Sequence, residues 1–288
     1  MILNEYMKNF YRKATSEELK HYQQKLYPLQ DQIFELASLY EDKVFLTGGT
    51  ALSRFYFNHR LSDDLDFFTT TNDLKLIAND LIARLLDKSF SVEVDKLDIY
   101  FARFFVGDRN YRTKIDFVRE FNLYGELVKT KEGIYISNLE DIGANKITAF
   151  EDRAEIKDII DLYFIKKNVS FERLFEIADI KRVPIPYENL LTINVDGISG
   201  KVLTIVDIDE KELTNFVAVL KEKTECEIKK KEKLAHINLE RIINKILWDF
   251  PPEDRGINKY SIPVLKRRLN KLPLPEKNTV AKELTPVH

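Results

Sequence analysis

Two adjacent glycines, Gly48-Gly49, lie between a short apolar run and a short helical run. This arrangement constrains the fold of the 288-residue chain more than any other feature. Residues 43–47 predict a strand, residues 51–57 a short helix, and residues 64–68, which alternate acidic and apolar side chains, a second strand. Glycines at such a turn let backbone N–H groups approach an anion closely, at a helix N-terminus that favours negative charge. A Gly-Gly pair alone is usually just a turn, but the order of these segments predicts an α/β fold.

The second strand carries two acids on one face. Side chains alternate along a strand, so Asp64 and Asp66 project to one side and their apolar neighbours project into a core. Neighbouring carboxylates destabilise each other's charged forms, and a divalent cation between them relieves this repulsion. Asp116 lies between two apolar residues of another predicted strand and joins the cluster if the two strands pair. A solvated sheet face would also carry alternate acids, so the pair by itself leaves both interpretations open.

The rest of the chain predicts further helices and strands. Apolar residues at steps of three and four between 16 and 40 predict an amphipathic helix that Pro28 kinks or divides. The same criteria predict helices over 74–86, 138–150, 154–166, 171–178, 211–223 and 229–248, and strands over 91–95, 99–106 and 114–119. The segment 183–186 (Val-Pro-Ile-Pro) predicts a break, and the proline-rich end from 263 predicts an extended tail.

The character of the chain changes after residue 166, which predicts two domains. Residues 1–168 form an α/β domain that includes the N-terminal helices 16–40. Residues 169–288 form a mainly helical domain with a basic tail. Residues 221–288 contain 16 Lys and Arg against 10 Asp and Glu, although the whole chain has a net charge of -2. A basic end favours nucleic acid as a partner, and a solvated lysine-rich helix face explains it about as well.

The composition narrows the class of protein. Hydrophobic residues make up 44% of the chain, which is enough for a core and excludes general disorder. The single cysteine, Cys226, excludes an intrachain disulfide and a CxxC metal site and favours a reducing compartment. The four histidines are too scattered for a histidine-based zinc site. Since no run is apolar enough for a membrane helix and the N-terminus lacks the basic lead of a secretory signal, we expect a cytoplasmic protein.

The glycine turn, the Asp-x-Asp strand and the later acid together resemble the polymerase-β-like nucleotidyltransferase superfamily. More narrowly, residues 48–52 and 59–68 look like the AbiEii/AbiGii toxin family, which includes the MenT toxins. That family also carries a Lys…Arg…(Arg/Lys)-Asp-x-x-Asp-Leu signature on two consecutive helices. It is matched here by Lys146, Arg153, Lys157-Asp158 and Asp161-Leu162. The resemblance covers roughly residues 40–166, and it departs from the family at Lys157, where Arg is commoner, and at Thr50, where wider relatives have Ser.

The resemblance implies a nucleotidyltransferase fold, with a small mixed sheet, flanking helices and a helical C-terminal domain. It implies an enzyme that uses NTP with Mg²⁺ (or Mn²⁺) and acts as the toxin of a type IV toxin–antitoxin or phage-defence system. The implied acceptor is RNA, such as a tRNA 3′ end, and the implied protein partner is an antitoxin encoded nearby.

Nucleotidyl transfer depends on positioning and charge stabilisation, commonly with two metal ions. The resemblance therefore predicts a role for each matching residue. The predicted metal ligands are Asp64, Asp66 and Asp116, with Asp116 also a candidate to activate the acceptor hydroxyl. The predicted phosphate contacts are Gly48, Gly49, Thr50, Arg60 and Lys146, and Asp158 is the predicted acid near the acceptor. Ordinary alternatives stay open: a surface position for Lys146, a structural hydrogen bond for His59, and structural ion pairs for Asp158 and Asp161.

Two other functions compete with an RNA-modifying toxin. One is a small-molecule nucleotidyltransferase of the antibiotic-modifying type, and the other is a catalytically idle nucleotide-binding or regulatory module. The presence of Asp64, Asp66 and Asp116 disfavours an idle module. The basic 221–288 region modestly favours RNA over a small acceptor.

Overall fold

The computed structural model describes residues 10–107, 111–181, 187–191, 193 and 201–248, with side chains to residue 234. The chain divides into two compact units, Met1–Thr224 and Glu225–His288. The predicted boundary at 168/169 falls inside the first unit, and as a division between functional domains it stays a prediction. The predicted break at 183–186 and the predicted tail from 263 lie outside the described residues.

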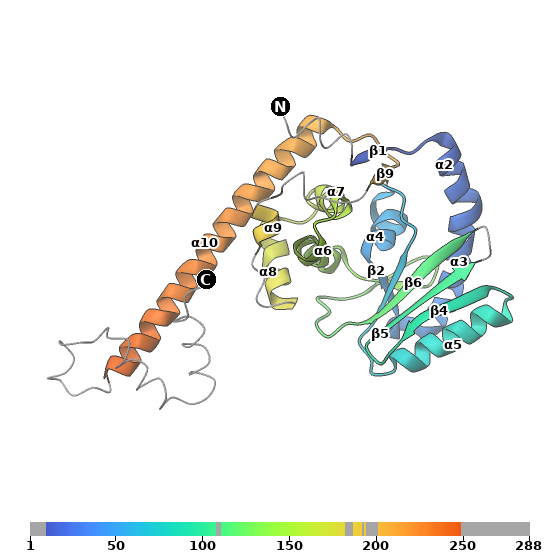
Figure 1. The fold of residues 1–288 in the computed structure, drawn as a ribbon, viewed down its shortest axis with the longest axis horizontal. Coiled ribbons are helices and arrows are strands. Elements are labelled where there is room, and N and C mark those ends of the chain that lie inside the picture. Colours follow the sequence, from blue (N-terminus) through green and yellow to red (C-terminus); the bar gives the residue numbers. More distant parts are fainter. Residues whose placement is uncertain (1–9, 108–110, 182–186, 192, 194–200, 249–288) are drawn as a thin grey trace. The chain divides into compact units, whose positions relative to one another are not determined.

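A seven-stranded mixed sheet forms the centre of the first unit (Figure 1). Its strands, in spatial order, are β4 (Ser91–Leu97), β5 (Phe101–Gly107), β6 (Arg112–Arg119), β3 (Leu65–Thr69), β2 (Phe45–Thr47), β8 (Tyr135–Ile136) and β7 (Val128–Lys129). The β3–β6 and β2–β8 pairs are parallel and the other neighbours antiparallel. A separate parallel pair joins β1 (Tyr11–Lys13) to β9 (Val202–Thr204). The mixed sheet with flanking helices confirms the predicted fold class.

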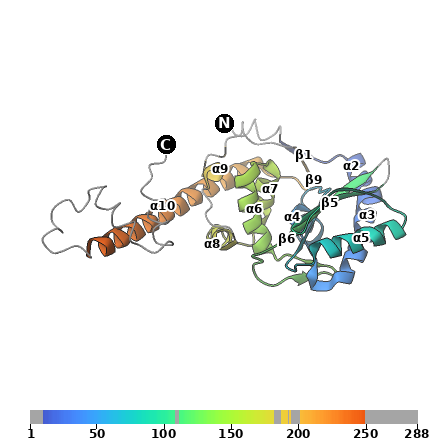
Figure 2. The same ribbon diagram turned by 60° about the horizontal axis from the view of Figure 1, so that its bottom comes forward.

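One face of this sheet is covered by helices α3 (Tyr27–Ala37) and α5 (Leu74–Asp87) (Figures 1 and 2). The central strands place alternate apolar residues on this face, and all of them are buried: Leu65, Phe67, Ala102, Phe104, Val106, Ile115 and Phe117. Helix α5 contributes buried residues at helical spacing: Leu74, Ile77, Ala78, Leu81 and Leu85. Because side chains alternate along a strand, the opposite face of β3 and β6 carries the acids.

The N-terminal helical segment starts at a capping box. The Thr15 hydroxyl accepts a hydrogen bond from the Glu18 backbone N–H, and the Glu18 carboxylate accepts one from the Thr15 N–H, so α2 (Ser16–His21) begins there. A π-helical turn, Tyr22–Leu26, links α2 to α3, whose first turn contains Pro28. Proline cannot donate the backbone hydrogen bond that continues a regular helix, so it marks a change of helical type here. A 3-10 segment, Ser38–Lys43, follows α3.

The remaining helices are α4 (Gly48–Ala51) with a π-helical continuation (Leu52–Phe57), α6 (Leu139–Arg153), α7 (Ile156–Ile165), α8 (Phe171–Lys181), α9 (Glu188–Leu191) and α10 (Glu210–Trp248). Most of them follow the sequence-based expectations; α9 was not predicted, α4 begins at Gly48 rather than at residue 51, and α10 differs in continuity. Helix α6 packs against α7, α8 and α9. Two separate helices were expected over 211–248, and this prediction is wrong: α10 is continuous, because the segment contains neither Gly nor Pro. No helix within the described residues is both long and apolar enough to cross a membrane.

Candidate active site

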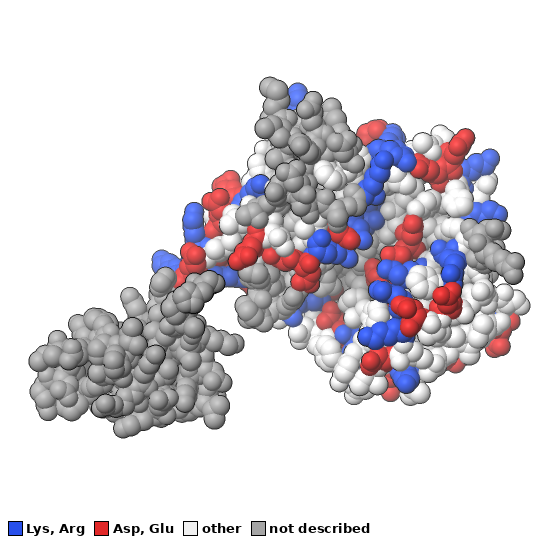
Figure 3. Space-filling model, viewed as in Figure 1, with Lys and Arg blue, Asp and Glu red and all other residues white. Residues whose placement is uncertain are grey.

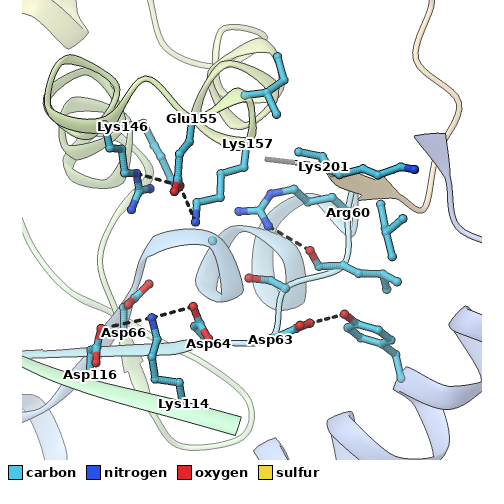
Figure 4. A pocket seen from close by; sticks show the side chains of 18 of the residues that line it. Arg60, Asp63, Asp64, Asp66, Lys114, Asp116, Lys146, Glu155, Lys157 and Lys201 are labelled. Carbon is cyan, nitrogen blue, oxygen red and sulfur yellow. Dashed lines mark hydrogen bonds and ion pairs between the residues drawn. The ribbon is translucent and has the colours of Figure 1, made fainter. Parts of the chain in front are cut away.

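A cavity of about 470 Å³ opens at the edge of β3 and β6. Its lining comes from the loop before β3, the strands β3, β5 and β6, the helices α6 and α7, and the start of β9. The residues are Tyr22, Gly49, Arg60, Leu61, Ser62, Asp63, Asp64, Asp66, Arg103, Lys114, Asp116, Lys146, Arg153, Glu155, Ile156, Lys157, Lys201, Val202 and Leu203. Figure 4 shows Asp63, Asp64, Asp66 and Asp116 on one side, with Lys114 between two of them. It shows Arg60, Lys146, Lys157 and Lys201 on the other, with Glu155 beside Lys157. The cavity therefore has an acidic side and a basic side.

The acidic side results from the parallel pairing of β3 with β6. The register places Asp66 opposite Asp116, and Asp64 lies directly before β3. The three acids that the sequence predicted to meet are thus brought together. Loss of hydration raises the pKa of Asp66, and the charges of Asp64 and Asp116 raise it further. This is the repulsion expected where carboxylates share a small volume.

Two cations from the same sheet contact these acids. Lys114, two residues before Asp116 on β6, places its Nζ 2.9 Å from Asp64 Oδ2 and 3.5 Å from Asp116 Oδ2. Arg103, opposite Asp116 on β5, donates from Nε and Nη2 to both oxygens of that carboxylate at 2.7 and 2.8 Å. Figure 3 shows basic and acidic side chains interspersed over the region of β4–β6. Neither cation was predicted from the sequence, although each occupies a position that alternates with apolar residues along its strand.

The glycine turn lies against the acidic side. Gly48 has φ +70°, and a Cβ there would lie 2.5 Å from Asp66 Oδ2. A Cβ on Gly49 would collide with the guanidinium of Arg60. Both positions therefore require glycine, the first for its backbone conformation and both for close approach. Gly49 lines the cavity, and Gly48 does not.

Thr50 lies beneath this turn and is fully buried. Its hydroxyl donates to the backbone carbonyl of Asp64 and is also within 3.0 Å of Ser62 Oγ. Thr50 does not line the cavity. Its hydrogen bond fixes the backbone just before β3. Because the side chain is buried, its hydroxyl is not exposed to the cavity.

A buried charge network stands behind the basic side. Asp161, on α7, has no exposed surface and accepts from Arg60 Nε and Nη2 at 2.7 and 2.9 Å. Lys146 Nζ on α6 lies 2.7 Å from Asp161 Oδ2, and His59 Nε2 lies 2.7 Å from Asp161 Oδ1. Although burial alone would raise the pKa of Asp161, Arg60 and Lys146 hold it well below its usual range. Burial lowers the pKa of His59, although the hydrogen bond and charge of Asp161 act in the opposite direction, and the ring makes the structural hydrogen bond that stayed open as an alternative.

Asp158 holds the second half of this network. It is fully buried and accepts from Lys146 Nζ at 3.0 Å and from Arg153 Nε and Nη2 at 2.9 and 2.8 Å. Burial raises the pKa of Asp158, but Lys146 and Arg153 outweigh it and leave the pKa lowered. The Lys…Arg…Asp-x-x-Asp signature is therefore a scaffold in which two buried acids orient cations. Lys146, with a side chain only 6% exposed, and Arg153 reach the cavity, and Asp158 does not.

Segments distant in sequence complete the cavity wall. The Leu61 N–H donates to the Leu203 carbonyl, and the Ile205 N–H donates to the His59 carbonyl, both at 2.8 Å. These bonds fasten β9 to the loop before β3, so that Lys201 lines the cavity. On the opposite wall, the Tyr22 hydroxyl donates to Asp63. No sequence pattern pointed to these contacts, because β9 is three residues long.

The acidic side suits a hard divalent cation in its chemistry, since all its donors are carboxylate oxygens. Within the residues that the structure describes, no group of three or more His, Cys, Asp or Glu side chains surrounds one point closely enough to hold an ion. Lys114 and Arg103 contact the oxygens of Asp64 and Asp116 instead. The acids therefore suit a divalent cation by the chemistry of their oxygens, and in this structure Lys114 and Arg103 occupy those oxygens.

The family model "Nucleotidyl transferase AbiEii toxin, Type IV TA system" matches residues 33–182, which is more than half of the chain. The chain belongs to the AbiEii family. The predicted resemblance is thereby confirmed, and with it the prediction of an enzyme: AbiEii proteins are nucleotidyltransferase toxins of type IV toxin–antitoxin systems. Membership implies an NTP substrate and an antitoxin partner.

Solved structures align with this chain at low sequence identity. MenT4, a nucleotidyltransferase toxin from Mycobacterium tuberculosis, aligns with a TM-score of 0.53 and 13% identity over 88% of this chain and 92% of its own. A nucleotidyltransferase and the protein JHP933, both from Helicobacter pylori, align with TM-scores of 0.46. Their identities are 18% and 16%, over 75% and 78% of this chain and 98% and 99% of their own. No curated protein matches the sequence. The likeness to MenT4 supports the nucleotidyltransferase fold of this AbiEii protein.

Proposed function

We propose that this AbiEii protein transfers a nucleoside monophosphate from NTP to an RNA acceptor, such as a tRNA 3′ end, with Mg²⁺ (or Mn²⁺) as cofactor. The observation that carries the proposal is the two-sided cavity. Carboxylates from β3 and β6 face cations that α6 and the loop before β3 present. A triphosphate needs both: cations for its oxygens and carboxylates for the metal that accompanies it.

Asp64, Asp66 and Asp116 would hold the metal. When bound, the ion would neutralise charge on the phosphates and make the acceptor hydroxyl easier to deprotonate. The acceptor hydroxyl gives up its proton and its oxygen bonds to the α-phosphorus. The bond between the α-phosphorus and the oxygen that bridges to the β-phosphate breaks, and pyrophosphate leaves with that oxygen. Asp116 remains the predicted group that helps activate the hydroxyl. Both its oxygens contact Arg103, so this role requires one of those bonds to open.

The basic side would hold the triphosphate. Lys146 and Arg60 reach the cavity from the buried network and are oriented by Asp161 before any ligand binds. Preorganised cations of this kind need little rearrangement when a phosphate arrives. The glycine turn would place the backbone N–H of Gly49, which lines the cavity, near the same phosphates. Gly48 would support this contact through its backbone conformation.

Thr50 and Asp158 take supporting roles in this proposal. Since both are fully buried and neither lines the cavity, we assign Thr50 to holding the Asp64 backbone. We assign Asp158 to positioning Lys146 and Arg153. This replaces the direct phosphate and acceptor contacts that the sequence predicts for them.

RNA is the acceptor that the charge distribution favours. Residues 221–288 carry an excess of Lys and Arg, and a phosphate backbone binds such a region in a salt-dependent manner. An RNA acceptor also fits the reducing, cytoplasmic setting that the single cysteine favours. The proposal also includes an antitoxin, encoded nearby, that inhibits the toxin, and a role for the pair in phage defence.

Expression in bacteria with and without the neighbouring gene tests this function. Growth should stop when the chain is expressed alone, and sequencing of tRNA 3′ ends should show added nucleotides. A variant with both Asp64→Ala and Asp66→Ala should grow normally and leave the ends unmodified. Growth arrest with unchanged RNA ends would instead favour a small-molecule acceptor.

A further inference from the structure

The side chain of Lys114 stands where the carboxylates would meet a metal ion. Its Nζ is 2.9 Å from Asp64 Oδ2 and 3.5 Å from Asp116 Oδ2, and it carries one positive charge. The parallel register explains the position: Ile115 lies opposite Leu65, so residue 114 falls level with residue 64. An ammonium and a divalent cation cannot both occupy the oxygens between these acids.

Arg103 also contacts the acids but is fixed more firmly than Lys114. Its guanidinium forms two hydrogen bonds with Asp116, and its Cζ lies 5.2 Å from the centroid of the Phe101 ring. Such a planar fork is held by geometry as well as by charge. Lys114 is bound through one nitrogen on a flexible chain. Both side chains line the cavity and are partly exposed, Lys114 by 27% and Arg103 by 36%, so the difference between them lies in the two-bond geometry and not in exposure. Of the two cations, Lys114 is therefore the one that can leave.

We propose that Lys114 is a built-in counter-ion that occupies the metal position until metal and nucleotide arrive together. In the free protein its ammonium neutralises Asp64 and Asp116 and opposes binding of a lone divalent cation. When a metal–nucleotide complex enters, the ammonium turns from the carboxylates to the phosphates, which lie in the same cavity. The inference rests on the proposed metal-dependent function, and it adds that Lys114 couples the metal to the nucleotide.

This arrangement predicts opposite effects of one substitution on two ligands. Lys114→Gln removes the competing charge, so Mn²⁺ alone should bind about ten-fold more tightly or better. The same substitution removes a cation that would hold the triphosphate. In saturating Mn²⁺, the nucleotide should therefore bind several-fold more weakly. A purely structural role for Lys114 would not produce effects of opposite sign.

The experiment measures Mn²⁺ binding by electron paramagnetic resonance in the absence of nucleotide. It then measures displacement of a fluorescent NTP analogue by unlabelled NTP in saturating Mn²⁺. Lys157→Gln is the matched control for Mn²⁺ binding, because it removes the same charge from the cavity wall but its Nζ contacts Glu155 at 2.6 Å and not the acid cluster. Since Lys157 belongs to the basic side, the control for nucleotide binding is Lys88→Gln, whose Nζ contacts Glu35 at 2.9 Å outside the cavity. Lys114→Met is the second variant if Lys114→Gln does not fold, and Asp64→Asn reports whether the acids bind Mn²⁺.

The outcomes separate this inference from the proposed function. Tighter Mn²⁺ and weaker nucleotide binding in Lys114→Gln, with Mn²⁺ binding unchanged in Lys157→Gln and nucleotide binding unchanged in Lys88→Gln, would support the coupling. Unchanged or weaker Mn²⁺ binding in the Lys114 variants would overturn the proposed role of Lys114. If Asp64→Asn lost Mn²⁺ binding in the same experiment, the proposed metal site would still stand. If Asp64→Asn binds Mn²⁺ as wild type does, both the metal assignment and the role of Lys114 are refuted.

Discussion

Replacement of Asp161 by Asn tests whether the buried charge network holds the basic side together. Four contacts of 2.7–2.9 Å converge on this carboxylate: His59 Nε2, Arg60 Nε and Nη2, and Lys146 Nζ. Asparagine keeps one acceptor oxygen but presents an N–H₂ group, and no charge, to the cations. Arg60, with a side chain 6% exposed, would then be buried beside a neutral partner, while Lys146, equally buried, would keep only Asp158 at 3.0 Å. Removing one partner of a buried ion pair costs about 3–5 kcal/mol, so we expect a loss of that size.

Urea unfolding followed by circular dichroism measures this loss directly. Asp80→Asn is the matched control. Its carboxylate accepts from Arg84 at the same 2.7 Å, but both side chains are nearly half exposed. Exposed pairs contribute little because solvent screens them, and the control should unfold almost as wild type does. A loss below about 1 kcal/mol in Asp161→Asn, a size typical of surface pairs, would refute the network as the support of the basic side.

Other predictions concern pH, the acidic side, the glycine turn and the C-terminal region. Because the pKa of Asp161 is lowered by folding, its ionisation stabilises the protein above the unfolded value of about 3.9. This stabilisation is lost as pH falls through the lowered pKa, and unfolding measured from pH 6 to about pH 2 should be less pH-dependent in Asp161→Asn. Burial raises the pKa of Asp66, so Asp66→Asn should leave the free energy of unfolding at pH 7 unchanged or higher without metal, and a clear loss would contradict this assignment. Gly49→Ala should displace the Arg60 guanidinium and weaken nucleotide binding at least about ten-fold in a fluorescence titration; wild-type affinity would show that the turn does not contact the ligand. Charge reversal of 266–268 (Lys-Arg-Arg) should lower RNA affinity and flatten its salt dependence, and identical slopes would exclude this run as an RNA-binding surface.

Local patterns in the sequence predicted the acidic side well. Alternation along the strands gave the common face of Asp64 and Asp66, and the apolar flanks of Asp116 predicted its strand. These inferences succeed because strand geometry fixes which side chains share a face. The glycine turn was found for a similar reason, since Gly48 adopts a conformation that favours glycine.

Contacts set by the packing of distant segments were not predictable. Arg103 meets Asp116 through the register between β5 and β6, and Asp161 meets Arg60 across 101 residues. No periodicity encodes such pairs. Residues of the same family signature also differ in their access to the cavity, because some are buried behind others. Lys146 reaches the cavity, whereas Asp158, from the same signature, lies wholly behind it. Strands of two or three residues, such as β9, are too short to show alternation.

The measurement that tests the central claim most directly is transfer of label from α-phosphate-labelled NTP to RNA by the purified protein. Each NTP would be supplied with Mg²⁺ and total tRNA, and the products would be separated by size. We predict labelled tRNA with at least one NTP, loss of labelling in EDTA, and none with the Asp64→Ala/Asp66→Ala variant. Absence of label with every NTP in Mg²⁺ and in Mn²⁺, or equal labelling by the double variant, would contradict the account.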